Sequence, residues 1–214
     1  MEKNELLNES AKKGGLMKGS KWWGIFLFLL LVFVDQLTKL LADVYFSSAG
    51  SPSKISFIPN WIEFRITYNR GISYGLGSDA SPVLKIAVIA VTGIMMAGLA
   101  VLYCKTDKRR SWLNTALVFI VSGGAGNLID RVYYRVWEAN GAYGVRDMVD
   151  LSRFGFAVCN FADFFISIGA VILVLALLFL DTDAVFPATK KYKALAKEAE
   201  EKAEAKKQAK QNNG

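Results

Sequence analysis

The sequence predicts an all-α polytopic membrane protein with four transmembrane helices and a small extracytoplasmic β-sheet. Of its 214 residues, 53% are hydrophobic, and the mean hydropathy is +0.28. This composition does not suit the solvated surface of a soluble domain. Four apolar runs also reach the length of about 20 residues that a helix needs to cross a hydrocarbon core of roughly 30 Å. An alternating polar and apolar stretch between the first two runs predicts the sheet.

The four predicted spans are Trp22 to Leu41, Pro82 to Cys104, Trp112 to Ile129 and Phe161 to Leu180. The formal net charge is +7, and the lysines and arginines gather at the span ends. This distribution favours an orientation signal over a nucleic-acid-binding face, so we expect no nucleic-acid partner. By the positive-inside rule both termini are cytoplasmic, and the loops at about 42–81 and 130–160 are extracytoplasmic.

Three parts follow along the chain: a cytoplasmic N-terminal segment at residues 1–21, a membrane domain at 22–180 and a charged cytoplasmic tail at 181–214. Within the first loop, apolar and polar residues alternate from Ile62 to Tyr68, as in a half-buried strand. Ile55 and Phe57 precede this strand across Pro59-Asn60, which predicts a hairpin. The pair Ser81-Pro82 predicts the N-terminus of the second span.

The residue types restrict the possible chemistry. The chain contains no histidine, which excludes Ser-His and Cys-His nucleophile pairs. A zinc site would need its two cysteines, which lie at opposite membrane faces, or carboxylates alone, and zinc disfavours both sets. We therefore expect neither a metal nor another cofactor. Carboxylates, amides and a few basic residues remain.

Four clusters of polar residues lie at the predicted extracytoplasmic face. They are Asp35 with Lys39; Asn69; Asn127 with Asp130 and Arg131; and Asn160 with Asp163. Each has a structural explanation: an i,i+4 ion pair, helix contacts at Gly123 to Gly126, or a helix cap with an acidic N3 residue. Their coincidence at one depth of the membrane still predicts a site, because ionisable groups there are costly.

Two carboxylates can hold and activate a water when one is ionised and the other is protonated. Asp163 and Asp150 are the predicted pair, because Asp150 lies in the segment that leads into the fourth span. Asp147 is expected to be solvated, because an aspartate beside an arginine on a loop usually is.

Five motifs occur in order on this four-span frame. They are Asp35-Gln36-Leu37-Thr38-Lys39, Asn69-Arg70-Gly71-Ile72-Ser73-Tyr74-Gly75, Gly123-Gly124-Ala125-Gly126-Asn127-Leu128-Ile129-Asp130-Arg131, Met148-Val149-Asp150 and Asn160-Phe161-Ala162-Asp163. Together they closely resemble the lipoprotein signal peptidase family, also called signal peptidase II, over roughly Trp22 to Leu180.

The resemblance implies an aspartic endopeptidase of the bacterial cytoplasmic (inner) membrane. Such an enzyme removes signal peptides from prolipoproteins immediately before a diacylglyceryl-modified cysteine. Expected partners are these prolipoproteins, membrane lipids and globomycin-type inhibitors, and we expect a monomer. The resemblance assigns catalysis to Asp150 and Asp163. Substrate binding or site organisation falls to Asp35, Lys39, Asn69, Gly71, Gly126, Asn127, Asp130, Arg131, Asn160 and Ala162.

Three alternatives remain open at this point. A Ser-Lys peptidase would use Lys39 to activate Ser73 or Ser122. An ion or proton transporter would line its pathway with Asp35, Asp130, Asp150, Asp163 and Arg131. A purely structural subunit would have no activity.

Overall fold

The structure is a computed structural model that describes residues 21–71, 80–106, 110–138, 141, 143–180 and the single positions 197, 201 and 208. Its four long helices are α2 (Lys21–Ser47), α3 (Pro82–Lys105), α4 (Ser111–Tyr133) and α5 (Phe161–Leu175), the last continued by the π-helical turn η3 (Ala176–Leu180). All four are long and apolar enough to span a membrane. The predicted four-helix membrane fold is therefore confirmed. The predicted N-terminal segment, apart from Lys21, and nearly all of the tail lie outside the described residues.

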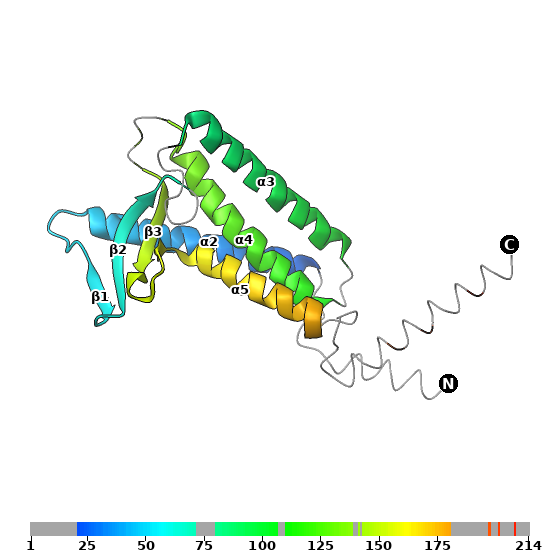
Figure 1. The fold of residues 1–214 in the computed structure, drawn as a ribbon. Helices are drawn as coiled ribbons and strands as arrows, with labels where there is room; N and C mark the ends of the chain where they lie inside the picture. Colours follow the sequence, from blue (N-terminus) through cyan, green and yellow to red (C-terminus); the bar gives the residue numbers. More distant parts are fainter. Residues whose placement is uncertain are drawn as a thin grey trace.

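A four-stranded antiparallel sheet lies at one end of the helices (Figure 1). Its strands are β1 (Ile55–Ile58), β2 (Ile62–Asn69), β3 (Val145–Asp150) and β4 (Val158–Cys159), in that order. The β1–β2 hairpin was predicted, and its turn contains Asn60 at φ 65°, a left-handed conformation that asparagine tolerates. The sequence did not predict β3 and β4, which arise from the loop between α4 and α5.

Helix α4 packs against the other three helices and is closest to α5. Glycine permits this approach on both helices. A Cβ on Gly123 would collide with the carbonyl oxygen of Ala162, and one on Gly169 would lie 2.9 Å from the backbone nitrogen of Ile120. An apolar cluster of Leu31, Val118 and Phe165 joins α2, α4 and α5.

Capping residues fix where α3 and α5 begin. Ser81 Oγ accepts a hydrogen bond from Leu84 N at 3.3 Å, with Pro82 in the first turn, as predicted. Asn160 and Asp163 form a reciprocal capping box at the start of α5. The cap places Asp163 at the sheet end of the helices.

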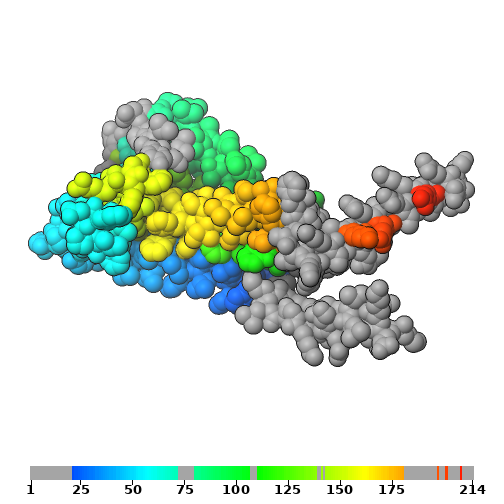
Figure 2. All heavy atoms as spheres, turned by 60° about the horizontal axis from the view of Figure 1, so that its bottom comes forward, coloured from blue at the N-terminus to red at the C-terminus, as the bar shows by residue number. Residues whose placement is uncertain are grey.

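The outer faces of the helices are apolar and exposed. Phe33 on α2, Val83 and Ile94 on α3, and Val171 on α5 are among the large hydrophobic side chains that lie on these faces. Figure 2 shows α5 running along one such face, with the sheet gathered at its end. Acyl chains can cover these side chains without the cost that water would impose.

The contact between α4 and α5 generates a stability prediction. We expect Gly123→Ala to lower the thermal unfolding midpoint, because overpacking of this kind costs about 1–3 kcal/mol. Gly98→Ala on α3 is the matched control, since a Cβ added at Gly98 would meet nothing within 4 Å. Thermal denaturation in detergent compares the two variants. An unfolding midpoint for Gly123→Ala equal to that of Gly98→Ala would contradict the close packing described here.

Candidate active site

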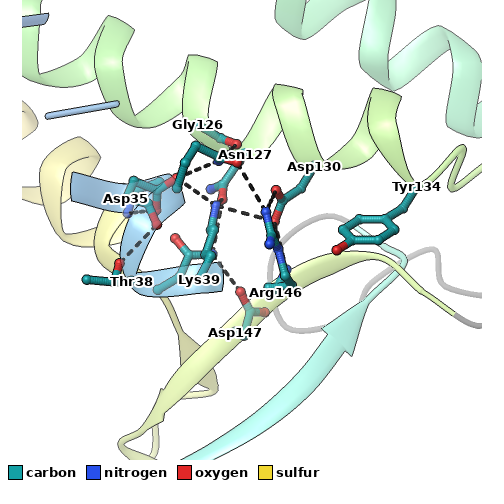
Figure 3. A network of polar contacts seen from close by, with 12 residues as sticks. Asp35, Thr38, Lys39, Gly126, Asn127, Asp130, Tyr134, Arg146 and Asp147 are labelled. Atoms are coloured by element: carbon teal, nitrogen blue, oxygen red, sulfur yellow. Dashed lines mark hydrogen bonds and ion pairs between the residues drawn. The ribbon is translucent and has the colours of Figure 1, made fainter. Parts of the chain in front are cut away.

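Lys39 is fully buried at the centre of a polar network between α2 and α4 (Figure 3). Its ammonium lies 2.9 Å from Asp35 Oδ2 and 3.6 Å from Asp130 Oδ2, and it donates to Asn127 Oδ1 at 3.0 Å. The i,i+4 spacing of Asp35 and Lys39 also suits an ion pair that reaches the membrane interface. The structure instead buries both partners completely.

Asp130 is a second fully buried carboxylate, and it binds β3 to α4. Arg146 Nη2 donates to Asp130 Oδ1 at 2.7 Å, and Arg146 Nε donates to Asp130 Oδ2 at 3.3 Å. The backbone nitrogen of Arg146 also donates to Asp130 Oδ2, at 3.0 Å. The network thus contains two carboxylates, Asp35 and Asp130, and two cations, Lys39 and Arg146. Its formal charges cancel.

Asp35 links α2 to the beginning of α5. Its Oδ1 accepts a hydrogen bond from the backbone nitrogen of Ala162 at 2.9 Å. A Cβ on Gly126 would collide with the Asp35 carboxylate, so glycine is required for α4 to pass this close. Gln36, also on α2, connects this helix to α4. Its side-chain amide donates to Asp35 Oδ2 at 3.1 Å and to Gly126 O at 3.0 Å. These contacts explain why Gly126 and Ala162 belong to the site.

Two side-chain amides connect this network to a pair of aspartates. Asn127 Nδ2 donates to Asp163 Oδ1 at 2.8 Å. Asn160 Nδ2 donates to Asn127 Oδ1 at 3.0 Å and to Asp147 Oδ1 at 2.6 Å. The backbone nitrogen of Asn160 donates to Asp163 Oδ2 at 3.1 Å. Asn160 is therefore hydrogen-bonded to both Asp147 and Asp163.

The environment of Asp147 disfavours the ionised form of its carboxyl group. It lies on β3 and is only 4% exposed. Burial, together with the negative charge of Asp163, raises the pKa of Asp147 from 3.8 to about 7, while hydrogen bonds from Asn160 and Asn69 act in the opposite direction. Near neutral pH this carboxyl group can both hold and release a proton.

Asp150 lies in a different environment. Its Oδ2 is 2.8 Å from Arg65 Nε, and its Oδ1 accepts hydrogen bonds from the backbone and the hydroxyl of Ser152. Partial burial acts to raise the pKa of Asp150, but the hydrogen bonds from Ser152 and the charge of Arg65 outweigh it and hold the pKa below 3.8. Its position three residues after Asp147 on one strand directs the two side chains to opposite faces of β3.

These contacts differ from the sequence-based pairing of Asp150 with Asp163. The contacts bring Asp147, which was expected to be solvated, to the Asn160 and Asp163 cluster, and they tie Asp150 to Arg65. A signal for this was present in the sequence. If Val145 to Asp150 is treated as a strand, Asp147 faces the same side as the apolar residues Val145 and Val149.

The remaining predicted residues border this pair. Asn69, at the end of β2, is hydrogen-bonded to Asp147, and its Oδ1 accepts from Gly71 N at 2.9 Å. Arg131 Nη2 donates to Gly71 O at 3.4 Å. The charges of Asp163, Asp147 and Asp130 all act on the Arg131 guanidinium. Arg146, Gln36 and Asp147 are the residues of the site that the sequence-based reasoning missed.

The geometry also bears on the serine alternative and on metal binding. Ser122 Oγ donates to Val118 O at 2.6 Å, within its own helix, and the contacts of Lys39 are with Asp35, Asn127 and Asp130. Ser73 lies outside the described residues. Within the part of the chain that the structure describes, no three histidine, cysteine, aspartate or glutamate residues are grouped as metal ligands would be.

Known proteins are similar to this chain in sequence and in fold. The family model described as "Signal peptidase (SPase) II" matches residues 27–179. A lipoprotein signal peptidase of Fusobacterium nucleatum is 32% identical, covering 73% of this chain and 87% of its own. One from Bifidobacterium longum subsp. infantis is 35% identical, covering 69% and 73%. A solved structure described as a bacterial membrane enzyme, determined by the in meso method at 2.3 Å resolution, is similar with a TM-score of 0.58 and 25% identity over 72% of this chain and 87% of that one.

A match over most of the membrane region, together with relatives above 30% identity along most of their own length, establishes the relationship. The motifs that carried the resemblance all lie within the matched residues. The chain belongs to the signal peptidase II family, the membrane peptidases that process lipoproteins.

Proposed function

We propose that this peptidase cleaves prolipoproteins immediately before their diacylglyceryl-modified cysteine, by an aspartic mechanism in which Asp147 and Asp163 are the catalytic pair. The observation that carries the proposal is that Asn160 is hydrogen-bonded to both carboxylates, through its side chain to Asp147 and through its backbone to Asp163. Signal-peptide removal from lipoproteins is common to the family. The catalytic residues and the cleavage position are our proposal.

The two carboxylates are suited to different roles. Asp163 accepts hydrogen bonds from Asn127 Nδ2 and Asn160 N, and it lies in the first turn of α5, where the helix dipole favours a negative charge. Asp147 has a pKa raised to about 7 by burial and by the charge of Asp163. We therefore assign the proton of the pair to Asp147.

Hydrolysis follows from this distribution of charge. Ionised Asp163 takes a proton from a water molecule as the water oxygen attacks the scissile carbonyl carbon. Protonated Asp147 donates a hydrogen bond to the carbonyl oxygen and stabilises the charge that develops there. As the C–N bond breaks, Asp163 delivers the proton that it took from water to the leaving amine of the modified cysteine, and Asp147 keeps its own proton. The products are a carboxylate on the signal peptide and a new N-terminal amine.

The other predicted site residues hold this pair in place or bind the substrate. Asn127 and Asn160 orient the carboxylates, while Asp35, Lys39 and Asp130 form the buried network beneath them. Gly126 leaves room for the Asp35 carboxylate, and the backbone nitrogen of Ala162 donates a hydrogen bond to it. Asn69 and Gly71 follow one another closely at the end of β2, and Arg131 on α4 donates to Gly71 O. We assign these three residues to substrate binding.

The location of the pair suits a lipid-modified substrate. The site lies between the sheet and the ends of the membrane-spanning helices (Figures 1 and 3). A diacylglyceryl group confines the substrate to the bilayer, so it reaches such a site by lateral diffusion. Globomycin-type cyclic peptides are the expected inhibitors, because the family resemblance implies them.

The catalytic pair can be tested on purified protein in detergent with a diacylglyceryl-modified prolipoprotein, by measuring turnover and sequencing the new N-terminus. We expect Asp147→Asn and Asp163→Asn each to lower kcat by about 10²- to 10⁴-fold or more, because an amide can neither ionise nor transfer the proton. Asp150→Asn is the matched control on the same strand. Its kcat should stay near that of the wild type.

The opposite result has a clear meaning. An inactive Asp150→Asn beside an active Asp147→Asn would restore the pairing inferred from sequence. Near-normal turnover of both Asp147→Asn and Asp163→Asn, with labelling by a serine reagent, would favour the Ser-Lys alternative. Ion flux through liposomes in the absence of cleavage would favour a transporter.

The shared proton also predicts how stability depends on pH. The pKa of Asp147 is raised in the folded state to about 7, so between its unfolded value of 3.8 and about 7 the folded state binds more protons. Stability of the wild type should fall as pH rises through that window. Asp147→Asn removes this dependence. The thermal unfolding midpoint of the variant should therefore rise relative to that of the wild type as the pH increases from acidic to neutral. A difference in midpoint that stays constant with pH would show that Asp147 does not titrate abnormally.

We further propose that both termini are cytoplasmic and that the site faces the extracytoplasmic side, because basic residues flank the opposite ends of the spans. Reporter fusions near Ser51 and Gly141 should be extracytoplasmic, and a fusion at Gly214 should be cytoplasmic. An external location of Gly214 would contradict the orientation.

A further inference from the structure

Arg146 precedes the proposed catalytic Asp147 on β3 and is almost completely buried. Its guanidinium donates to both oxygens of Asp130 and, through Nη2, to Gln36 Oε1 at 3.1 Å. The guanidinium thus joins β3 to α4 and to α2. Neither the motifs nor the proposed chemistry assigns this side chain a role.

The backbone of the same residue is held by the same carboxylate. Arg146 N donates to Asp130 Oδ2 at 3.0 Å, so Asp130 holds the main chain and the side chain of Arg146 together. Asp147 is the next residue along the strand. Any shift of Arg146 relative to α4 therefore moves the Asp147 carboxyl group relative to Asp163, which α5 holds separately.

An aromatic cluster covers the other side of the guanidinium. Arg146 Cζ lies 5.4 Å from the ring centroid of Tyr134, which stacks on Tyr143 with centroids 5.5 Å apart. Tyr143 meets Tyr68 edge to face at 4.9 Å, and the hydroxyl of Tyr68 donates to Asp43 near the end of α2. The cation is held between a carboxylate and a π face, an arrangement that restricts its movement.

From these contacts we propose that Arg146 is a positioning residue for catalysis, which sets the placement of β3 against α4 so that Asp147 meets Asp163. This inference rests on the proposed function of the Asp147 and Asp163 pair. Arginine suits the role because its planar fork engages both oxygens of Asp130 at once, whereas a lysine ammonium would act as a single point charge.

A positioning role for Arg146 and a purely stabilising role have different effects on the kinetics. Removing one partner of a buried ion pair destabilises a protein because the other charge is left uncompensated. Such a loss lowers the amount of folded enzyme without changing the turnover of each folded molecule. A positioning role lowers kcat per folded molecule and leaves KM little changed, since substrate binding does not depend on the alignment of the carboxylates.

The test compares Arg146→Met and Arg146→Lys with the wild type, using kcat and KM per folded enzyme on a diacylglyceryl-modified prolipoprotein. Folded enzyme is quantified by size-exclusion chromatography and circular dichroism. We expect Arg146→Met to lower kcat about 10- to 100-fold, the scale of a misplacement of roughly 1 Å. We expect KM to stay within about twofold of the wild type. Arg146→Lys should lose less. Arg65→Met, which removes an arginine from the neighbouring strand β2, is the matched control and should keep its kcat.

A double-mutant cycle tests the route through Asp130. If Arg146 acts through this carboxylate, the double variant Asp130→Asn, Arg146→Met should lose less kcat than the product of the fold-losses of the two single variants. Multiplicative losses would overturn the inference, as would a wild-type kcat for Arg146→Met. If Arg146→Met does not fold, Arg146→Lys decides: a lowered kcat at unchanged KM supports the inference, and an unchanged kcat overturns it. Failure of the proposed function is a separate result, because it appears as an active Asp147→Asn.

Discussion

A charge buried among membrane-spanning helices has no water to solvate it, so it must find its partner within the protein. Asp130 shows this requirement most clearly. It is fully buried, it accepts hydrogen bonds from the Arg146 backbone and guanidinium, and it lies 3.6 Å from Lys39. Asp35 supplies the second negative charge. Two carboxylates thus offset two cations, and the cost of burying each is reduced only while all four stay together.

The same contacts position the two aspartates of the proposed catalytic pair. Asp35 binds the first turn of α5 through Ala162 N, which places Asp163. Asp130 binds β3 through Arg146, which places Asp147. The amides of Asn127 and Asn160 then connect the two aspartates to each other and to Lys39. The carboxylates that would activate water are therefore located by secondary-structure elements that the neutral network holds together.

Much of this was predictable from the sequence, for physical reasons. The four spans and the β1–β2 hairpin follow from local patterns of apolar residues, and the structure confirms both. The position of the polar clusters along the spans also gives their depth in the membrane. The residues concerned are Asp35, Lys39, Asn127, Asp130, Asn160 and Asp163. The choice between Asp147 and Asp150 depends on recognising β3, because strand alternation then places Asp147 on the side of Val145 and Val149. The contact of Arg146 with Asp130, 16 residues away, does not follow from local patterns, and a single sequence does not reveal such a pairing.

We propose that Asp147 and Asp163 form a coupled pair with one shared proton. The most direct test is infrared difference spectroscopy of the carboxylic acid C=O stretch as a function of pH, on the wild type, Asp147→Asn and Asp150→Asn. We predict a protonated carboxyl band that titrates with a pKa of about 7, persists in Asp150→Asn and is lost in Asp147→Asn. A band that survives in Asp147→Asn and vanishes in Asp150→Asn, or a wild type with no such band below about pH 6, would contradict the account.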